Sequence, residues 1–205
     1  MPNPSVFDLD QSTMAGNILA TLGRATDAEI TDGRVWYRAA NTFAHGLTDA
    51  YPVSLEQACG IIAALSPRLG WGANMRGAEA ICAGSRPGAV LPVNVAKAER
   101  IRDGEAPLDV LGGPKVRAFY ANILLPVGRQ GNGVTIDSHA VAIAFAEVLT
   151  KANPGPRVDR QKLYDHVVGA YVEAARETPF LPHELQAITW VAWRRIHSNP
   201  AQYDR

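Results

Sequence analysis

The sequence predicts an all-α fold. Runs of Val, Ile and Thr that alternate with polar residues are almost absent. Ala-rich segments with apolar residues three and four positions apart recur along most of the chain, which is the periodicity of amphipathic helices. The chain has 205 residues, of which 47% are hydrophobic and 20% charged, so we expect a single folded domain, built as one body or as two lobes.

Sequence signals mark several helix boundaries in the first half of the chain. Ser54 followed by Gln57 is the pattern of a capping box, and Asn94 is a suitable N-cap. Gly46, Gly84 and Gly104 follow apolar-periodic segments, where glycine is favoured as a helix terminator. The helices expected here span residues 13–25, 32–46, 54–65, 72–83 and 95–102.

The second half contains a short apolar helix near residue 108 and then longer ones. Asp159 is a suitable N-cap, and Pro/Gly-rich loops are expected at 85–92, 126–133 and 153–156. In the last helix, Trp190 and Trp193 lie among apolar residues, which favours core packing over a base-stacking surface. The helices expected here span residues 114–124, 138–151, 160–177 and 182–197.

Composition limits the compartment and the partners. The 20 basic and 20 acidic residues cancel, so a nucleic-acid site must be a local patch. Cys59 and Cys82 are too few for a disulfide framework and are expected as small buried hydrophobes in a reducing compartment. The first ten residues do not read as a signal peptide, and no stretch approaches the roughly 18 apolar residues of a spanning helix. We therefore expect a cytoplasmic, soluble protein without a membrane partner.

Histidine spacing gives no support for a metal site, and no cofactor is expected. Four histidines lie outside the D-x-H motif, and none of them has the spacing to another histidine that a helical metal motif requires. They are His45, His166, His183 and His197.

A turn between two helices is the first candidate for a functional site. Leu111 is followed by Gly112 and Gly113, and a helix then opens with Pro114 and Lys115. Glycine permits a tight turn, proline suits a first helical position, and the free N–H groups of the first helical turn can bind an anion such as phosphate. The segment is therefore a helix–hairpin–helix pattern.

Asp137 is the second candidate. It follows an apolar and β-branched segment, precedes a helix, and lies 22 residues after Lys115. It suits an N-cap, but a carboxylate at this position can also stabilise an oxocarbenium ion or orient water. His139, two residues on, either helps to build the site or is a structural histidine.

These motifs together resemble the helix–hairpin–helix DNA glycosylase superfamily. The matching positions are the hairpin with Lys115 and the D-x-H of Asp137 and His139, and the resemblance covers roughly residues 52–150. It implies a central helical lobe at about 52–150, a second lobe formed by residues 11–50 and 151–205, and a site between the lobes. The departures are Leu111 in place of the first hairpin glycine, an extra residue before Ala118, and Ala142 in place of an arginine.

The resemblance also implies a partner, double-stranded DNA, and its contact residues. The polar turn after residue 65 faces DNA in that superfamily, which makes its side chains candidates for holding a flipped base or the opened strand. The alternative for this turn is a surface loop with its tryptophan folded onto the core. The nucleic-acid-binding candidates are Arg68, Trp71, Asn74, Arg76, Gly112, Gly113, Arg117 and His139.

Asp137 and Lys115 are the catalytic candidates. A lysine attacks the sugar C1′ only as a neutral amine, which requires desolvation or positive neighbours such as Arg117. Lys115 thus has three open roles: nucleophile, phosphate contact or ordinary surface lysine.

The sequence supports three hypotheses about function. The first is a DNA glycosylase-like enzyme that flips out and releases a damaged or modified base. The second is a phage enzyme of base modification or nucleotide processing that retains Asp137, since residues 181–195 also look like a segment found in small proteins of actinobacterial phages and their hosts. The third is a non-catalytic DNA-binding protein.

Overall fold

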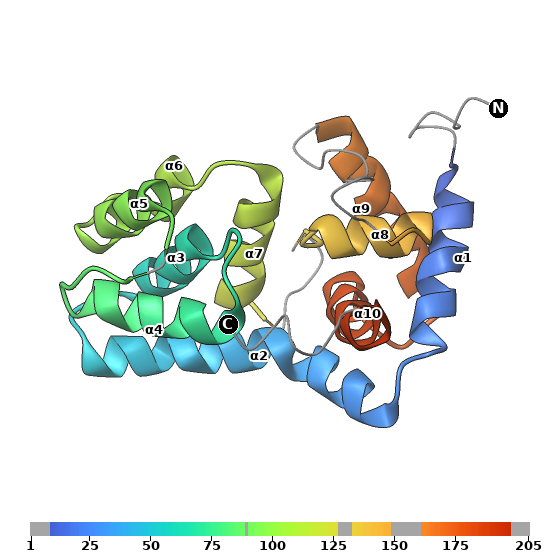
Figure 1. Ribbon diagram of the computed structural model, residues 1–205, viewed down its shortest axis with the longest axis horizontal. Helices are drawn as coiled ribbons and strands as arrows, with labels where there is room; N and C mark the ends of the chain where they lie inside the picture. The colour runs from blue at the N-terminus through green and yellow to red at the C-terminus, as the bar shows by residue number, and fades with distance from the viewer. Residues whose placement is uncertain (1–8, 89, 127–132, 149–160, 198–205) are drawn as a thin grey trace. The chain divides into compact units, whose positions relative to one another are not determined.

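The computed structural model describes residues 9–88, 90–126, 133–148 and 161–197, and within these ranges every regular element is a helix. The all-α prediction is confirmed. The helices are α1 (Gln11–Leu22), α2 (Asp27–Ala50), α3 (Leu55–Leu65), α4 (Trp71–Cys82), α5 (Pro92–Arg102), α6 (Pro107–Val110), α7 (Pro114–Leu124), α8 (Ser138–Phe145), α9 (Gln161–Ala175) and α10 (Pro182–His197) (Figure 1).

The chain divides into two compact units. Of the described residues, 9–36, 133–148 and 161–197 form the first unit, and 37–88 and 90–126 form the second. The first therefore holds α1, the start of α2, and α8 to α10, whereas the second holds the rest of α2 and α3 to α7. Residues 133–148, which carry Asp137, belong with the terminal helices.

The second unit is organised around α3. Every residue of this helix from Ala58 to Leu65 is buried, because the sequence there is apolar on all sides. In Figure 1, α3 lies between α4 and α5, and it also packs against α6 and α7. This central helix supports both the turn that follows it and the α6–α7 hairpin.

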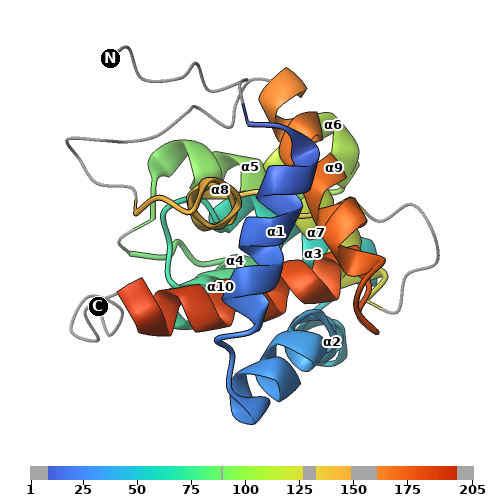
Figure 2. The same ribbon diagram turned by 90° about the vertical axis from the view of Figure 1, so that its right-hand side faces the viewer.

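The first unit packs α1 against α8, α9 and α10, and Figure 2 shows α1 crossing α10. The indole of Trp193 on α10 is 6% exposed and belongs to this core, as predicted, while Trp190 is half-buried. The largest fully buried side chains of this core are Met14, Ile18, Ile136, Ile143 and Tyr171.

Several predicted helix ends are confirmed. Ser54 and Gln57 form the capping box, with both side chain to backbone hydrogen bonds present. Gly84 and Gly104 end α4 and α5 at φ values of 77° and 106°, in the left-handed region that favours glycine.

Other predicted boundaries are wrong. Gly46 lies inside α2, which continues to Ala50, and Asn94 is a buried residue within α5 because Pro92 already occupies a first helical position. The predicted helix 138–151 ends at Phe145, where Ala146 adopts a left-handed conformation and the N–H of Glu147 bonds to the carbonyl of Ala142. Asp159 and the loop at 153–156 lie outside the described residues, as does most of the loop at 126–133.

Both cysteines are buried, as the sequence predicted. Burial raises the pKa of the Cys59 thiol to about 12 and that of Cys82 to about 11. The thiols therefore stay protonated at neutral pH and act as small apolar groups. Across the described part of the chain, no helix combines the length and apolar character needed to cross a bilayer.

Candidate functional site

Asp137 is the N-cap of α8, and both of its carboxylate oxygens accept hydrogen bonds. Oδ1 accepts from the backbone N–H of Ala140 at 2.8 Å, and Oδ2 accepts from the indole Nε1–H of Trp190 on α10 at 3.2 Å. The residue is half-buried. The cap that the sequence suggested is therefore present, and a second, long-range donor holds the same carboxylate.

The backbone leading into Asp137 is clamped by Tyr164 of α9. The Tyr164 hydroxyl donates to the carbonyl of Val134 at 2.6 Å and accepts from the N–H of Ile136 at 3.3 Å. Burial raises the pKa of Tyr164 to about 12, so the hydroxyl remains a donor at neutral pH. These bonds satisfy backbone groups of a buried extended segment and fix the direction in which the chain enters α8.

The Trp190 indole lies at the centre of an aromatic cluster in the first unit. The guanidinium of Arg194 lies over the ring at 4.3 Å from its centroid. The rings of Trp36 and His139 each meet Trp190 edge to face, with centroids 6.3 Å apart in both cases. His139, a predicted site residue, is thus close to Asp137 in space and shares its partner Trp190.

Sequence reasoning missed Trp190 as a site residue because it assigned the indole to core packing. The sequence separation between Asp137 and Trp190 is 53 residues, and no local motif links them. Tyr164 was also missed, because no local motif links it to the segment before Asp137. Only the packing of α8, α9 and α10 brings these groups together.

The predicted hairpin is present between α6 and α7. Gly113 has φ 75° and ψ 148°, a conformation open to glycine and unfavourable for other residues, and Pro114 begins α7. The first N–H groups of a helix have no intrahelical partner, so those of α7 are available to an anion. The turn has the local geometry expected from the sequence.

Arg117 closes this hairpin from within. Its guanidinium donates to the carbonyl of Leu111 at 2.9 Å and to that of Leu108 at 2.8 Å. These bonds satisfy carbonyl groups at the end of α6, which is too short to satisfy them itself. Arg117 was predicted as a DNA contact. In the structure its guanidinium stabilises the turn through these two hydrogen bonds.

Two lysines lie at the hairpin without a partner among the described residues. Lys115 is half-buried, and neither it nor Lys97 of α5 makes an ion pair or side-chain hydrogen bond there. A Cβ atom added to Gly112 would lie 3.8 Å from Lys97 Nζ, which places this second ammonium beside the turn. Sequence reasoning missed Lys97 because it belongs to a different helix and to no motif.

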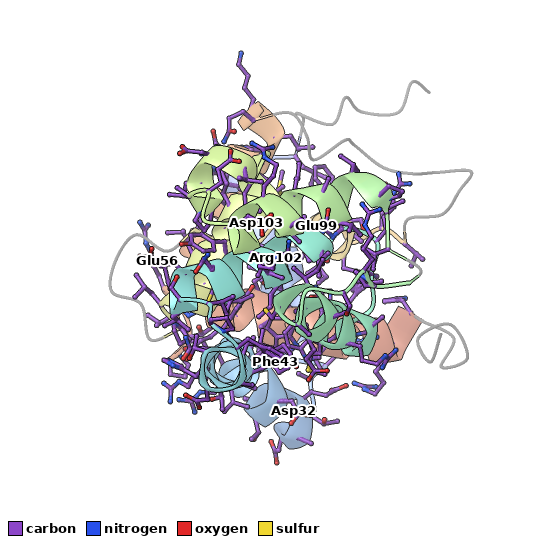
Figure 3. The ribbon with its side chains drawn as sticks, turned by 90° about the vertical axis from the view of Figure 1, so that its left-hand side faces the viewer. Asp32, Phe43, Glu56, Glu99, Arg102 and Asp103 are labelled. Carbon is purple, nitrogen blue, oxygen red and sulfur yellow. The ribbon has the colours of Figure 1, made fainter. Side chains whose placement is uncertain are left out.

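Arg100 and Arg102 of α5 form ion pairs with acidic residues, whereas Lys97 and Lys115 form none among the described residues. Arg102, the last residue of α5, pairs with the C-cap residue Asp103 at 2.8 Å, and Figure 3 labels both of them together with Glu99. Glu99 in turn pairs with Arg86 at 3.1 Å. The charge on this part of the second unit is therefore largely compensated locally.

The polar turn between α3 and α4 exposes Arg68 and, on α4, Arg76. Arg68 has φ 63°, which is rare for a residue with a side chain and marks a locally strained backbone. Trp71 is half-buried and meets Phe43 edge to face, with ring centroids 6.2 Å apart. The tryptophan is therefore folded against the helices, as the alternative reading of the turn expected.

Asn74 was predicted as a contact to DNA, which requires an exposed side chain, but its side chain is buried. It is 2% exposed, and its Nδ2 donates to the carbonyl of Ile62 at 3.1 Å. Because α4 turns this side chain toward α3, Asn74 joins the two helices instead of facing solvent.

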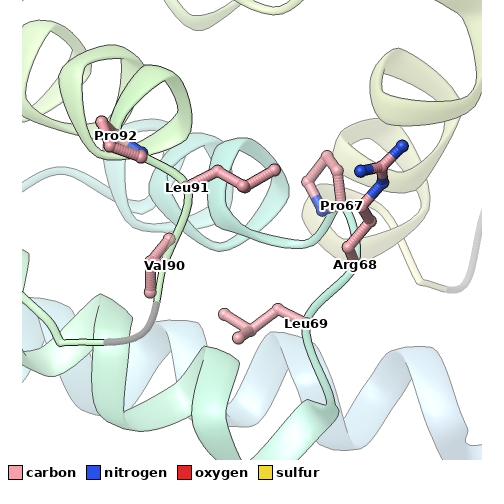
Figure 4. Close-up of a pocket in the computed structure, with 6 residues that line it drawn as sticks. All are labelled: Pro67, Arg68, Leu69, Val90, Leu91 and Pro92. Atoms are coloured by element: carbon pink, nitrogen blue, oxygen red, sulfur yellow. The ribbon is translucent and has the colours of Figure 1, made fainter.

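A small pocket of about 240 Å³ adjoins this turn in the second unit. Figure 4 shows Leu69, Val90 and Leu91 around it, with Arg68 at its edge. Its volume is below the roughly 300–1,000 Å³ of ordinary ligand sites, so it is too small to bury a whole nucleotide.

The candidate residues therefore fall into separate groups. Asp137, His139 and Trp190 are assembled in the first unit, whereas the hairpin and the α3–α4 turn belong to the second. The expectation that Asp137 and Lys115 line one cleft stays a prediction. Within the described ranges, no group of three or more His, Cys, Asp or Glu side chains is arranged to hold a metal ion.

The chain matches a model of a known protein family. A family model described as "Family of unknown function (DUF7178)" matches residues 3–197. Neither the curated proteins nor the solved structures give a match.

Proposed function

The chain belongs to this family of unknown function (DUF7178), and we propose that it is a DNA glycosylase-like enzyme that releases a base from DNA. The observation that carries the proposal is the Asp137 carboxylate, held through both oxygens by N–H donors while half-buried. An ionised carboxylate has about four acceptor sites, so accepting these bonds leaves lone pairs for a substrate or a water molecule.

The chemistry asked of Asp137 is the hydrolysis of an N-glycosidic bond. As the bond between C1′ and the base nitrogen breaks, the base leaves with the electron pair and the sugar develops oxocarbenium charge. A fixed carboxylate stabilises that charge, and it accepts a proton from the water that attacks C1′. The departing base takes up a proton from solvent, and the proton on Asp137 returns to solvent, so the products are a free base and an abasic site.

The hairpin supplies the second half of the proposal, which is binding to the phosphate backbone of double-stranded DNA. The available N–H groups of α7 and the ammonium groups of Lys97 and Lys115 favour an anion at this turn. In the proposed architecture this is a helix–hairpin–helix of a two-lobed, glycosylase-like fold.

Base release from duplexes that each carry one damaged or modified base tests the enzymatic proposal. We expect Asp137→Asn to slow release by at least about a hundredfold, because the neutral amide neither stabilises the cation nor accepts the proton. Asp10→Asn is the matched control, since Asp10 caps α1 through the N–H of Thr13 in the same manner. Full activity in Asp137→Asn would refute the mechanism.

The role of Lys115 is tested on the same substrate by borohydride trapping. If Lys115 attacks C1′, borohydride traps the wild type covalently on DNA and Lys115→Arg abolishes trapping. If Lys115 contacts phosphate, Lys115→Arg retains both binding and base release, because the charge is kept.

The hairpin also favours one alternative, a DNA-binding protein without catalysis. In that case the wild type binds duplex DNA in a salt-sensitive manner but releases no base. Under both hypotheses we expect Arg68→Ala or Arg76→Ala to weaken binding, with each lost phosphate contact lowering the salt dependence by about one unit of log–log slope. Absence of binding at low salt would exclude both.

A further inference from the structure

An N-cap needs only one carboxylate oxygen, yet Asp137 is held through both. Asp10 caps α1 by accepting a hydrogen bond from the backbone N–H of Thr13, within its own helix. At Asp137 the second oxygen accepts from Trp190, a residue of another helix. Resting on the proposed function, we infer that Trp190 is a positioning residue that fixes the orientation of the Asp137 carboxylate.

The contact restricts a torsion that is otherwise soft. The last torsion angle of an aspartate side chain has a broad distribution, so a carboxylate held through one oxygen can rotate about its terminal bond. Donors on both oxygens, at 2.8 Å and 3.2 Å, define the plane of the group. The remaining lone pairs of Asp137 then point in fixed directions, which is the condition for catalysis by orientation.

The indole is itself held in place. Arg194 follows Trp190 by four residues on α10, so the two side chains lie on the same face, and the guanidinium covers the ring at 4.3 Å. Trp36 and His139 contact the ring edge to face. A cation over an indole also draws electron density from it, which polarises the N–H and strengthens its hydrogen bond to a carboxylate.

Trp190 suits this role chemically because an indole N–H donates but neither accepts nor exchanges protons in the reaction. It holds the carboxylate without competing for the proton that Asp137 takes from water. Trp190 therefore acts through Asp137 and does not need to contact the substrate.

The hydrogen bond can be tested without any substrate, by the ¹⁵N-labelled indole resonances of the full-length protein. Asp137→Ser retains an N-cap for α8, but its side chain is too short to reach Trp190 at the same time. We expect the Trp190 Nε1–H signal to move upfield and to exchange faster with solvent, while the Trp193 signal does not change. An unchanged Trp190 signal would overturn the inference whatever the activity of the protein.

The positioning role is tested by Trp190→Phe, which keeps an aromatic ring and removes the donor. With the duplex from which the wild type releases a base, we expect the single-turnover rate to fall about ten- to a hundredfold while the dissociation constant for DNA stays the same. Trp193→Phe is the matched control, because this indole lies on the same helix and is buried, and it makes no hydrogen bond to Asp137. We expect it to lower stability and to leave the rate unchanged.

The outcomes separate this inference from the proposed function. If Asp137→Asn loses activity and Trp190→Phe does not, the inference fails and the function stands. If Trp190→Phe and Trp193→Phe slow the reaction equally, the effect of Trp190→Phe is structural and the inference fails. If the wild type releases no base from any duplex, the proposed function fails, and the indole resonances still decide whether Trp190 holds Asp137.

Discussion

The crossing of α2 and α10 in the first unit depends on the absence of a side chain at Gly33. A Cβ atom at this position would lie 2.4 Å from the Cα of Ile188 and 2.6 Å from its backbone nitrogen. Carbon atoms pack at about 3.5–4.0 Å, so the two helices would have to separate by roughly 1 Å or more. Because the obstructing atoms belong to the backbone, no rotamer change relieves the clash.

We expect Gly33→Ala to lower the free energy of unfolding. Overpacking of this kind costs about 1–3 kcal/mol or more, and the better helix propensity of alanine returns about 0.5–1 kcal/mol. A net loss of about 1–2 kcal/mol corresponds to a fall in melting temperature of roughly 2–8 °C for a chain of this length.

The assay is urea unfolding followed by circular dichroism, with Gly46→Ala as the matched control. Gly46 lies in the same helix, and a Cβ added there meets nothing within 4 Å. We therefore expect Gly46→Ala to be neutral or stabilising, by up to about 1 kcal/mol. Equal midpoints for Gly33→Ala and the wild type would refute the close approach of α2 and α10. Since α10 carries Trp190, Gly33→Ala should also shift the Trp190 indole resonance.

Three further predictions follow from single contacts. Gly113→Ala forces a side chain into a positive-φ conformation, so we expect it to lower the free energy of unfolding by about 1–3 kcal/mol and to weaken DNA binding. Urea unfolding measures the first effect, and fluorescence anisotropy at low salt measures the second. Unchanged binding would argue against a role of the hairpin. Arg195 donates to Glu29 and lowers the pKa of that carboxyl, so the contribution of the pair is present above the unfolded pKa and is lost as pH falls through the folded pKa. We expect Arg195→Gln to reduce stability at pH 7 and to flatten the acid side of the stability profile, and an identical profile would contradict the pairing. Tyr164→Phe leaves buried backbone groups before Asp137 without their partner and should cost about 1–3 kcal/mol and slow base release; wild-type stability and rate would show that the clamp is dispensable.

Local interactions between neighbouring residues determine many of the helix ends in this fold, so these ends could be predicted from the sequence. Residues that act on their own neighbours, such as Ser54 with Gln57 or the glycines that end α4 and α5, were predicted correctly because their hydrogen bonds close within one turn. The same holds for the cap at Asp137 and for the turn at Gly113. Short-range signals are strong where one residue type alone fits the backbone.

Boundaries that depend on packing were predicted less well. The sequence ended a helix at Gly46, but α2 continues to Ala50, since an isolated glycine costs only about 1 kcal/mol in a helix that is held by its neighbours. Ala146 ends α8 in a left-handed conformation that glycine would favour, and no sequence rule indicated that an alanine would occupy it.

The composition of the candidate site is the part that only the tertiary structure decided. The sequence identified Asp137 through a local pattern, and it also placed His139 beside it. It could not assign Trp190 and Tyr164 to this carboxylate, because their contacts join segments 53 and about 30 residues apart in the chain. Likewise, Lys97 reaches the hairpin only through the packing of α5. Periodicity predicts which face of a helix is buried, but which helices meet, and at which residues, depends on the packing of the whole unit.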